Sequence, residues 1–256
     1  MIGRQRNMLL IDKLFMFLCR VKCGFLEQDL AVRFNCHIST VSRKISTWTN
    51  SLYFALGSIN IWISKDQIFR TMPDCFKSLY PSTRVIIDCT EIKTERSSFL
   101  VLGSQVYSSY KSCHTWKGLV GFAPHGALTF VSSLYTGCMS DVEITKLCRI
   151  LDLLESGDSL MADKDFVLQK VLKGTSIEVN TPPFLMNKGQ FIAQEVEETQ
   201  TIAKLRIHIE RHIRRVKEFQ FFDGVVPLSM IGSIIQLWTV ANMLTLFKSS
   251  LVKGWN

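Results

Sequence analysis

The sequence predicts an α/β domain with a mixed five-stranded sheet over residues 81–256, preceded by a small all-α domain over residues 1–80. Three observations predict this division. Apolar residues recur at three- and four-residue spacing up to about residue 80, β-branched runs begin near residue 84, and predicted strands then alternate with helices. Because 47% of the 256 residues are hydrophobic, the chain can form a substantial core.

The first 80 residues have the pattern of amphipathic helices with a basic surface. Asp12 and Lys13 interrupt the first apolar stretch, which favours a buried helix over a signal peptide. Eleven Lys or Arg face five Asp or Glu in this region, a net +6 of the chain's +8, which suggests a polyanionic partner. The apolar positions are Leu9, Leu10, Leu14, Phe17, Leu18, Leu30, Phe34, Val41, Ile45 and Trp48.

Residues 29–50 match a helix-turn-helix. Ala31 is small where two helices would cross, and Asn35 lies where the turn needs a left-handed backbone, which Asn tolerates. Val41 would be buried, and Ser39 would cap the second helix. The exposed face would then present Thr40, Ser42, Arg43, Lys44 and Thr47 to DNA. The alternative is a helical hairpin that only packs on the next domain.

Strands and helices follow in an informative order. Residues 84–89, 118–122 and 128–135 predict three strands that could form an antiparallel meander, and a helix follows over residues 140–156. Residues 159–163 and 177–180 predict two more strands, and helices follow over 195–219 and 227–247. This order is typical of an RNase H-like domain, although many α/β folds share it.

The uncharged stretch 225–247 is long enough to cross a membrane, but polar residues recur along it, which favours a helix packed inside a protein. Eight cysteines occur without a CxxC pair, and this is typical of reduced thiols in an intracellular protein. No membrane partner is therefore expected.

Three acidic residues are candidate metal ligands. Asp88 ends the first predicted strand, Asp163 ends the fourth, and Glu210 lies on the long helix. In an RNase H-like sheet these strands are neighbours, so the carboxylates would converge and could hold two divalent cations for phosphodiester chemistry. Taken singly, each acid has a structural alternative, and Glu210 could simply pair with Arg206 or Arg214 at four-residue spacing.

The long helix also carries basic residues beside Glu210. Arg206, Arg214 and Lys217 flank the acid and could hold the DNA backbone beside the metals. Arg211 and Lys111 are further candidates for contact with DNA. An ordinary solvated charged face is the alternative interpretation.

Seven short stretches carry a resemblance to a known family. They are TRVIIDCTEI at 83–92, SYK at 109–111, KGLVG at 117–121, SD at 140–141, MADK at 161–164, PPFL at 182–185 and RIHIER at 206–211. With these stretches the chain resembles the DDE superfamily endonucleases, which include the transposases of Harbinger-type elements and their domesticated nuclease relatives. The resemblance runs from about residue 9 to residue 252.

The resemblance implies a function. Asp88, Asp163 and Glu210 would be the catalytic acidic triad, binding Mg²⁺ or Mn²⁺, with two ions expected. The chain would be a nuclear, transposase-derived endonuclease that hydrolyses DNA and carries out strand transfer. Double-stranded DNA at transposon ends, a homo-oligomer and a separate DNA-binding partner protein would be its partners. The alternative is a catalytically decayed, domesticated DNA-binding protein that keeps the transposase fold.

Two departures from the family pattern bear on activity. Many members carry an upstream zinc-binding domain that this sequence lacks, and the family usually has Gly where this chain has Asp165. If the strand continues to Asp165, its charge would lie near the metals. If the chain turns there, Asp would adopt a strained left-handed backbone. Either case predicts weak cleavage that Asp165→Gly would raise.

Overall fold

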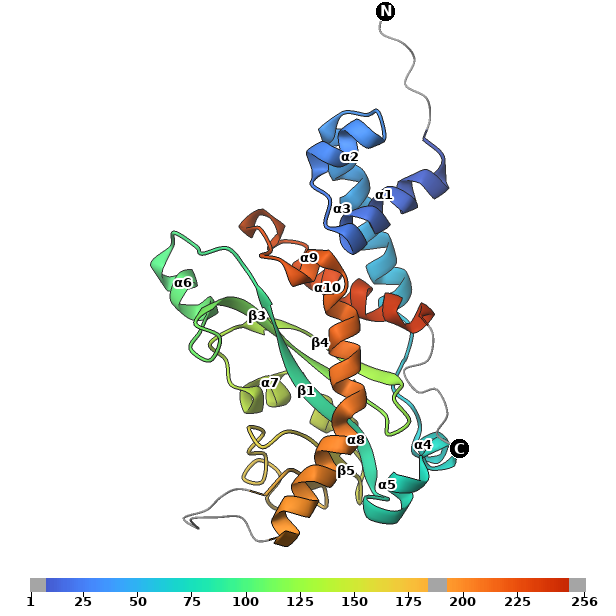
Figure 1. Ribbon diagram of the computed structural model, residues 1–256, viewed down its shortest axis with the longest axis vertical. Helices are drawn as coiled ribbons and strands as arrows, with labels where there is room; N and C mark the ends of the chain where they lie inside the picture. The colour runs from blue at the N-terminus through green and yellow to red at the C-terminus, as the bar shows by residue number, and fades with distance from the viewer. Residues whose placement is uncertain (1–7, 184–192, 249–256) are drawn as a thin grey trace, which may run out of the picture.

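The computed structural model describes residues 8–183 and 193–248. A central sheet carries a long helix across one face, and a helical unit from the first third of the chain stands at one end (Figure 1). This arrangement confirms the predicted class, an RNase H-like α/β domain preceded by a helical region. Of the PPFL stretch at 182–185, Phe184 and Leu185 lie outside the described residues.

The described part of the first 80 residues is helical, as its periodicity predicts, although the helices of this region do not all lie at the same end of the molecule (Figure 1). These helices are α1 (Leu10–Cys23), α2 (Glu27–Arg33), α3 (Ile38–Gly57), α4 (Lys65–Thr71) and α5 (Asp74–Leu79). This region packs directly on the α/β domain, because α3 contacts α10 (Ile234–Leu244) and α1 contacts α9 (Gln220–Asp223). Lys22 adds a direct link, since its Nζ donates to the Glu218 carbonyl at 3.0 Å.

The turn between α2 and α3 has the predicted geometry. Asn35 has φ of 46°, the left-handed backbone expected there, and Val41 is fully buried. The prediction that Ser39 caps the second helix is wrong. α3 begins at Ile38, so His37 is the N-cap and its Nδ1 accepts a hydrogen bond from the Ser39 backbone N–H. Ser39 instead lies one residue inside the helix.

The sheet has six strands in the described residues. Its members are β1 (Thr83–Lys93), β2 (Tyr107–Ser108), β3 (Cys113–Phe122), β4 (Leu128–Thr136), β5 (Ser159–Met161) and β6 (Glu178–Asn180). β1, β3 and β4 form the predicted antiparallel meander, while β5 pairs in parallel with β1 and β6 in parallel with β5. The first and fourth predicted strands are therefore neighbours, as expected.

One apolar core lies against each face of the sheet. Ile86 and Val120 face α8 (Ala193–Lys217) and α10, and this core continues into α1 and α3. Val85 and Ile87 face the opposite way, toward α7 (Asp141–Leu147) and the 3-10 helix η1 (Ile150–Leu153). The alternation along β1 follows from the period of two in a strand.

Several predicted bounds are wrong. The helix expected over 140–156 breaks between α7 and η1, where Arg149 adopts a φ of 61°. The stretch 227–247 divides into η2 (Leu228–Met230), α10 and η3 (Thr245–Phe247). The short elements α6 (Leu100–Val106) and β2 were not predicted. Within the described residues, no helix has the length and apolar character needed to cross a membrane.

Candidate active site

Asp88 and Asp163 are brought together by two neighbouring strands. Asp88 lies inside β1, which continues to Lys93 instead of ending at the acid as predicted. Asp163 follows the last residue of β5 by two positions, because that strand ends at Met161. Ile86 pairs with Met161 in the parallel register, so the acids two residues beyond each lie at equivalent positions.

Arg206 of α8 bridges the two carboxylates. Its Nη2 lies 3.5 Å from Asp88 Oδ2, and its Nη1 lies 3.2 Å from Asp163 Oδ1. The Arg206 side chain is only 7% exposed, and its Nε has no hydrogen-bond partner among the described residues. A buried guanidinium is stable here because it faces two acids, and the acids tolerate each other because of the cation between them.

The environment of Asp88 favours its protonated form. The pKa of Asp88 is raised from 3.8 to about 6, chiefly by burial and also by the negative charges of Asp163 and Asp141, although Arg206 and the Cys89 N–H oppose the increase. The Cys89 N–H donates to Asp88 Oδ1 at 2.9 Å, which holds the carboxylate in place. A nearby cation strongly stabilises the ionised form of a buried carboxylate.

Glu210, the third predicted acid, is exposed on α8 one turn beyond Arg206. The described residues contain no group of three or more His, Cys, Asp or Glu able to hold a metal ion. The structure thus brings two of the three acids together and does not gather Glu210 with them. α8 presents the arginine to the acids at the position where the third carboxylate was expected.

The donor set fits a divalent cation in part. Asp88 and Asp163 provide the carboxylate oxygens that hard cations prefer, and the guanidinium shared between them marks a place where positive charge is stable. Glu210 would complete the set only if α8 or its side chain moved. The site therefore suits a metal held first by the two aspartates, in competition with Arg206.

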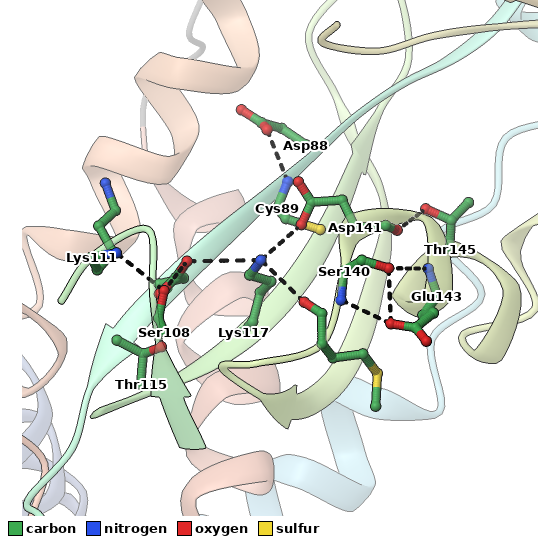
Figure 2. A network of polar contacts seen from close by, with 12 residues as sticks. Asp88, Cys89, Ser108, Lys111, Thr115, Lys117, Ser140, Asp141, Glu143 and Thr145 are labelled. Carbon is green, nitrogen blue, oxygen red and sulfur yellow. Dashed lines mark hydrogen bonds and ion pairs between the residues drawn. The ribbon is translucent and has the colours of Figure 1, made fainter. Parts of the chain in front are cut away.

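A second polar network lies against the other face of β1 (Figure 2). Lys117 of β3 stands opposite Glu91 in the antiparallel register, with Nζ 3.8 Å from its Oε1. Lys117 Nζ also donates to Asp141 Oδ1 at 3.0 Å and to the Met139 carbonyl at 3.2 Å. These contacts tie the start of α7 to the strand that carries Asp88.

The chain prepares this network locally. Ser140 caps α7, accepting from the Glu143 N–H while the Glu143 carboxylate accepts from the Ser140 N–H. Asp141 is thereby held beside Cys89, whose thiol pKa is raised well above its ordinary value by burial and by Asp141 and Asp88. The sequence signal for this network was charge at alternate positions of apolar strands, and no role was predicted for it.

The helix-turn-helix residues predicted to meet DNA lie along the first half of α3. Arg43 and Thr47 are exposed, whereas Thr40, Ser42 and Lys44 are half-buried. Two of these side chains also bond to their own helix: Arg43 Nε donates to the Ser39 carbonyl at 3.2 Å, and Thr47 Oγ1 donates to the Arg43 carbonyl at 2.7 Å. DNA contact by this face stays a prediction.

The other predicted DNA contacts are divided. Arg211, Arg214 and Lys111 are exposed, as a phosphate-binding role requires. Arg206 is buried between the acids, which leaves its charge engaged inside the protein and unsuited to a simple backbone contact. Its place beside the acids makes it part of the candidate site.

Neither geometry predicted for Asp165 is present. β5 ends at Met161, so no strand continues to Asp165, and Asp165 is not one of the described residues with positive φ. Asp165 is exposed on a turn, and the Val167 N–H donates to its backbone carbonyl at 3.1 Å. The physical reasons for expecting weak cleavage from this residue are therefore removed.

Comparison with protein families gives two matches. The model of the DDE superfamily endonuclease matches residues 87–245, which is more than half of the chain. The model described as the helix-turn-helix of DDE superfamily endonuclease matches residues 6–58. No curated protein matches the chain.

Proposed function

We propose, since the chain belongs to the DDE superfamily endonuclease family, that it is a transposase-derived, divalent-metal-dependent endonuclease acting on double-stranded DNA. The observation that carries the proposal is the meeting of Asp88 and Asp163 around a buried cation. Acids held this way, on adjacent strands of an RNase H-like sheet, are suited to metal-assisted phosphodiester chemistry.

Asp88 and Asp163 would hold the metal, and Glu210 is proposed as the third ligand. Bound Mg²⁺ or Mn²⁺, with two ions proposed, would activate a water or 3′-hydroxyl and stabilise the leaving oxygen of the scissile bond. Asp88 is oriented for this role by the Cys89 N–H. Arg206 would leave the acids when the metal binds, and its charge would then be free to face the scissile phosphate.

The helix-turn-helix would place the enzyme on its DNA. Its basic face on α3 includes Arg43 and Lys44, and the body of the protein holds α3 firmly through α10. We propose transposon ends as the substrate and strand transfer as a second reaction. Action in the nucleus, a homo-oligomer and a separate DNA-binding partner complete the proposal.

A second candidate function is DNA binding without catalysis. The observation that favours it is the exposed position of Glu210, together with the arginine that takes its place beside the two acids. In this case the fold and the helix-turn-helix would serve recognition alone.

The deciding experiment is cleavage of a duplex bearing terminal repeats in Mg²⁺, Mn²⁺ or EDTA. Asp88→Asn, Asp163→Asn and Glu210→Gln should each abolish cleavage and leave DNA binding intact. Asp165→Asn is the matched control, because it removes a nearby exposed acid. Metal-dependent cleavage that survives in one of the three variants would remove that residue from the site. Absence of cleavage by the unaltered chain, with DNA binding retained, would favour the second candidate.

A further inference from the structure

The end of α8 distant from the acids carries a lysine on the same helix face as Arg206. Lys217 follows Arg206 by eleven residues, which is about three turns, so it projects in nearly the same direction about 16 Å further along. Lys93, the last residue of β1, lies five residues beyond Asp88, which is also about 16 Å in a strand. Helix and strand thus carry their lysines equally far from the acids.

Lys111 joins these two from the turn before β3. Its backbone N–H donates to Ser108 Oγ at 3.2 Å, and Ser112 beside it has a φ of 52°. Its Nζ lies 4.7 Å from the centre of the Tyr110 ring, which holds the ammonium by a cation–π contact. Figure 2 shows Ser108 between Lys111 and Lys117, so the turn is fastened to the same network that supports β1.

The three lysines come from elements that meet at the end of β1. Ser108 accepts from the Lys111 N–H and donates to Glu91, two residues before Lys93, and the charges of Lys93 and Lys111 both act on Lys217. Lys217 is half-buried, and its pKa is lowered by burial and by the charges of Lys111 and Lys93, against opposing effects of Asp223 and Glu91. Glu91 already accepts hydrogen bonds from Thr115 and Ser108, at 2.7 and 3.1 Å. Among the described residues, none of the three lysines forms an ion pair. Like charges held together at a cost in free energy are a site for an anion.

We infer that Lys93, Lys111 and Lys217 bind backbone phosphates of the DNA about 16 Å from the acids. The inference rests on the proposed function, because it supplies a second contact for the same substrate. In B-DNA, successive phosphates of a strand are about 3.4 Å apart along the axis, so the contact lies about five base pairs from the scissile bond. The exposed Arg214, which lies along α8 between Arg206 and Lys217, adds positive charge between the two places.

A polyanion fits this cluster better than a small anion does. The lysines come from three separate elements, the end of a strand, a turn and the last turn of a helix, so they span a length of backbone. Lysine acts as a point charge with a flexible stem, which suits phosphates in any sequence. The contact would therefore strengthen binding without selecting bases.

The test measures binding of the full chain to a fluorescein-labelled 30-base-pair duplex of mixed sequence, in EDTA so that no cleavage occurs. The variant Lys93→Gln/Lys111→Gln/Lys217→Gln is compared with Lys146→Gln/Lys170→Gln/Lys173→Gln, which removes three exposed lysines elsewhere. The first variant should lower the slope of log affinity against log salt by about 2.7, at about 0.9 for each phosphate contact. Between 50 and 200 mM salt, unaltered protein should then lose about 40-fold more affinity than the variant does.

A slope change equal to that of the control variant would overturn the inference. Each single Lys→Gln variant is measured as well, and each should lower the slope by about 0.9, so a folding defect in the triple variant does not decide the result. Binding in EDTA is independent of catalysis. A lowered slope in a protein that never cleaves DNA would support the lysine cluster and reject the nuclease, while cleavage with an unchanged slope would do the reverse.

Discussion

Replacing Asp88 with Asn is expected to stabilise the metal-free protein at neutral and alkaline pH. Asn keeps the shape of the protonated acid and removes the charge that burial makes costly. The pKa of Asp88 is raised from 3.8 to about 6, so the folded protein retains a proton that the unfolded chain has lost between these values. The free energy of unfolding therefore decreases as the pH rises through this window, and the loss is complete above it.

The magnitude follows from the shift. A pKa raised by about two units, at about 1.36 kcal/mol each, corresponds to about 3 kcal/mol. Asp88→Asn should therefore increase the free energy of unfolding by about 3 kcal/mol at pH 8 and by about 1 kcal/mol at pH 4.5. Little is lost to solvent screening because the Asp88 side chain is 22% exposed. The opposing attraction of Arg206 is already contained in the pKa of about 6.

The assay is urea unfolding in EDTA at pH 4.5 and pH 8, followed by circular dichroism. Asp165→Asn is the control, since an exposed acid on a turn should change stability by no more than about 0.5 kcal/mol at either pH. The prediction fails if Asp88→Asn is less stable than the parent at pH 8, because the Arg206 contact would then outweigh the cost of burying the charge. It also fails if the two proteins differ in free energy of unfolding by the same amount at pH 4.5 and pH 8.

Four further predictions concern the site and the fold. Arg206→Met should strengthen Mn²⁺ binding about tenfold or more by calorimetry, because the competing cation is lost, and weaker binding would instead make Arg206 a positioning residue. Asn35→Ala should cost about 1 kcal/mol in urea unfolding while Asn35→Gly is neutral, because φ is 46°. Arg43→Ala/Lys44→Ala should lower the salt slope of DNA binding by about two, and an unchanged slope would favour the packing-hairpin alternative. Gly118→Ala should cost about 1–3 kcal/mol in thermal unfolding, since a Cβ there would lie 2.9 Å from the Trp238 ring, and an unchanged melting temperature would contradict that packing.

Local patterns were sufficient for much of the architecture. The β-branched run before Asp88, the glycine-spaced strand at 118–122 and the long amphipathic helix each depend on periods within one segment. The left-handed backbone at Asn35 also follows from a local requirement of the turn. Helix bounds were less predictable, because the break at Arg149 and the division of 227–247 depend on packing that no single segment encodes.

From the sequence alone, Asp88 and Asp163 were expected on neighbouring strands, because the order of strands and helices is typical of an RNase H-like sheet, although other α/β folds share that order. Only the tertiary structure decided which residue of α8 meets them. Arg206 and Glu210 are one helical turn apart, so a small difference in how α8 lies across the sheet selects one or the other. The structure places the arginine there, where its buried charge lies between a largely buried Asp88 and a half-exposed Asp163 and offsets the charges of both.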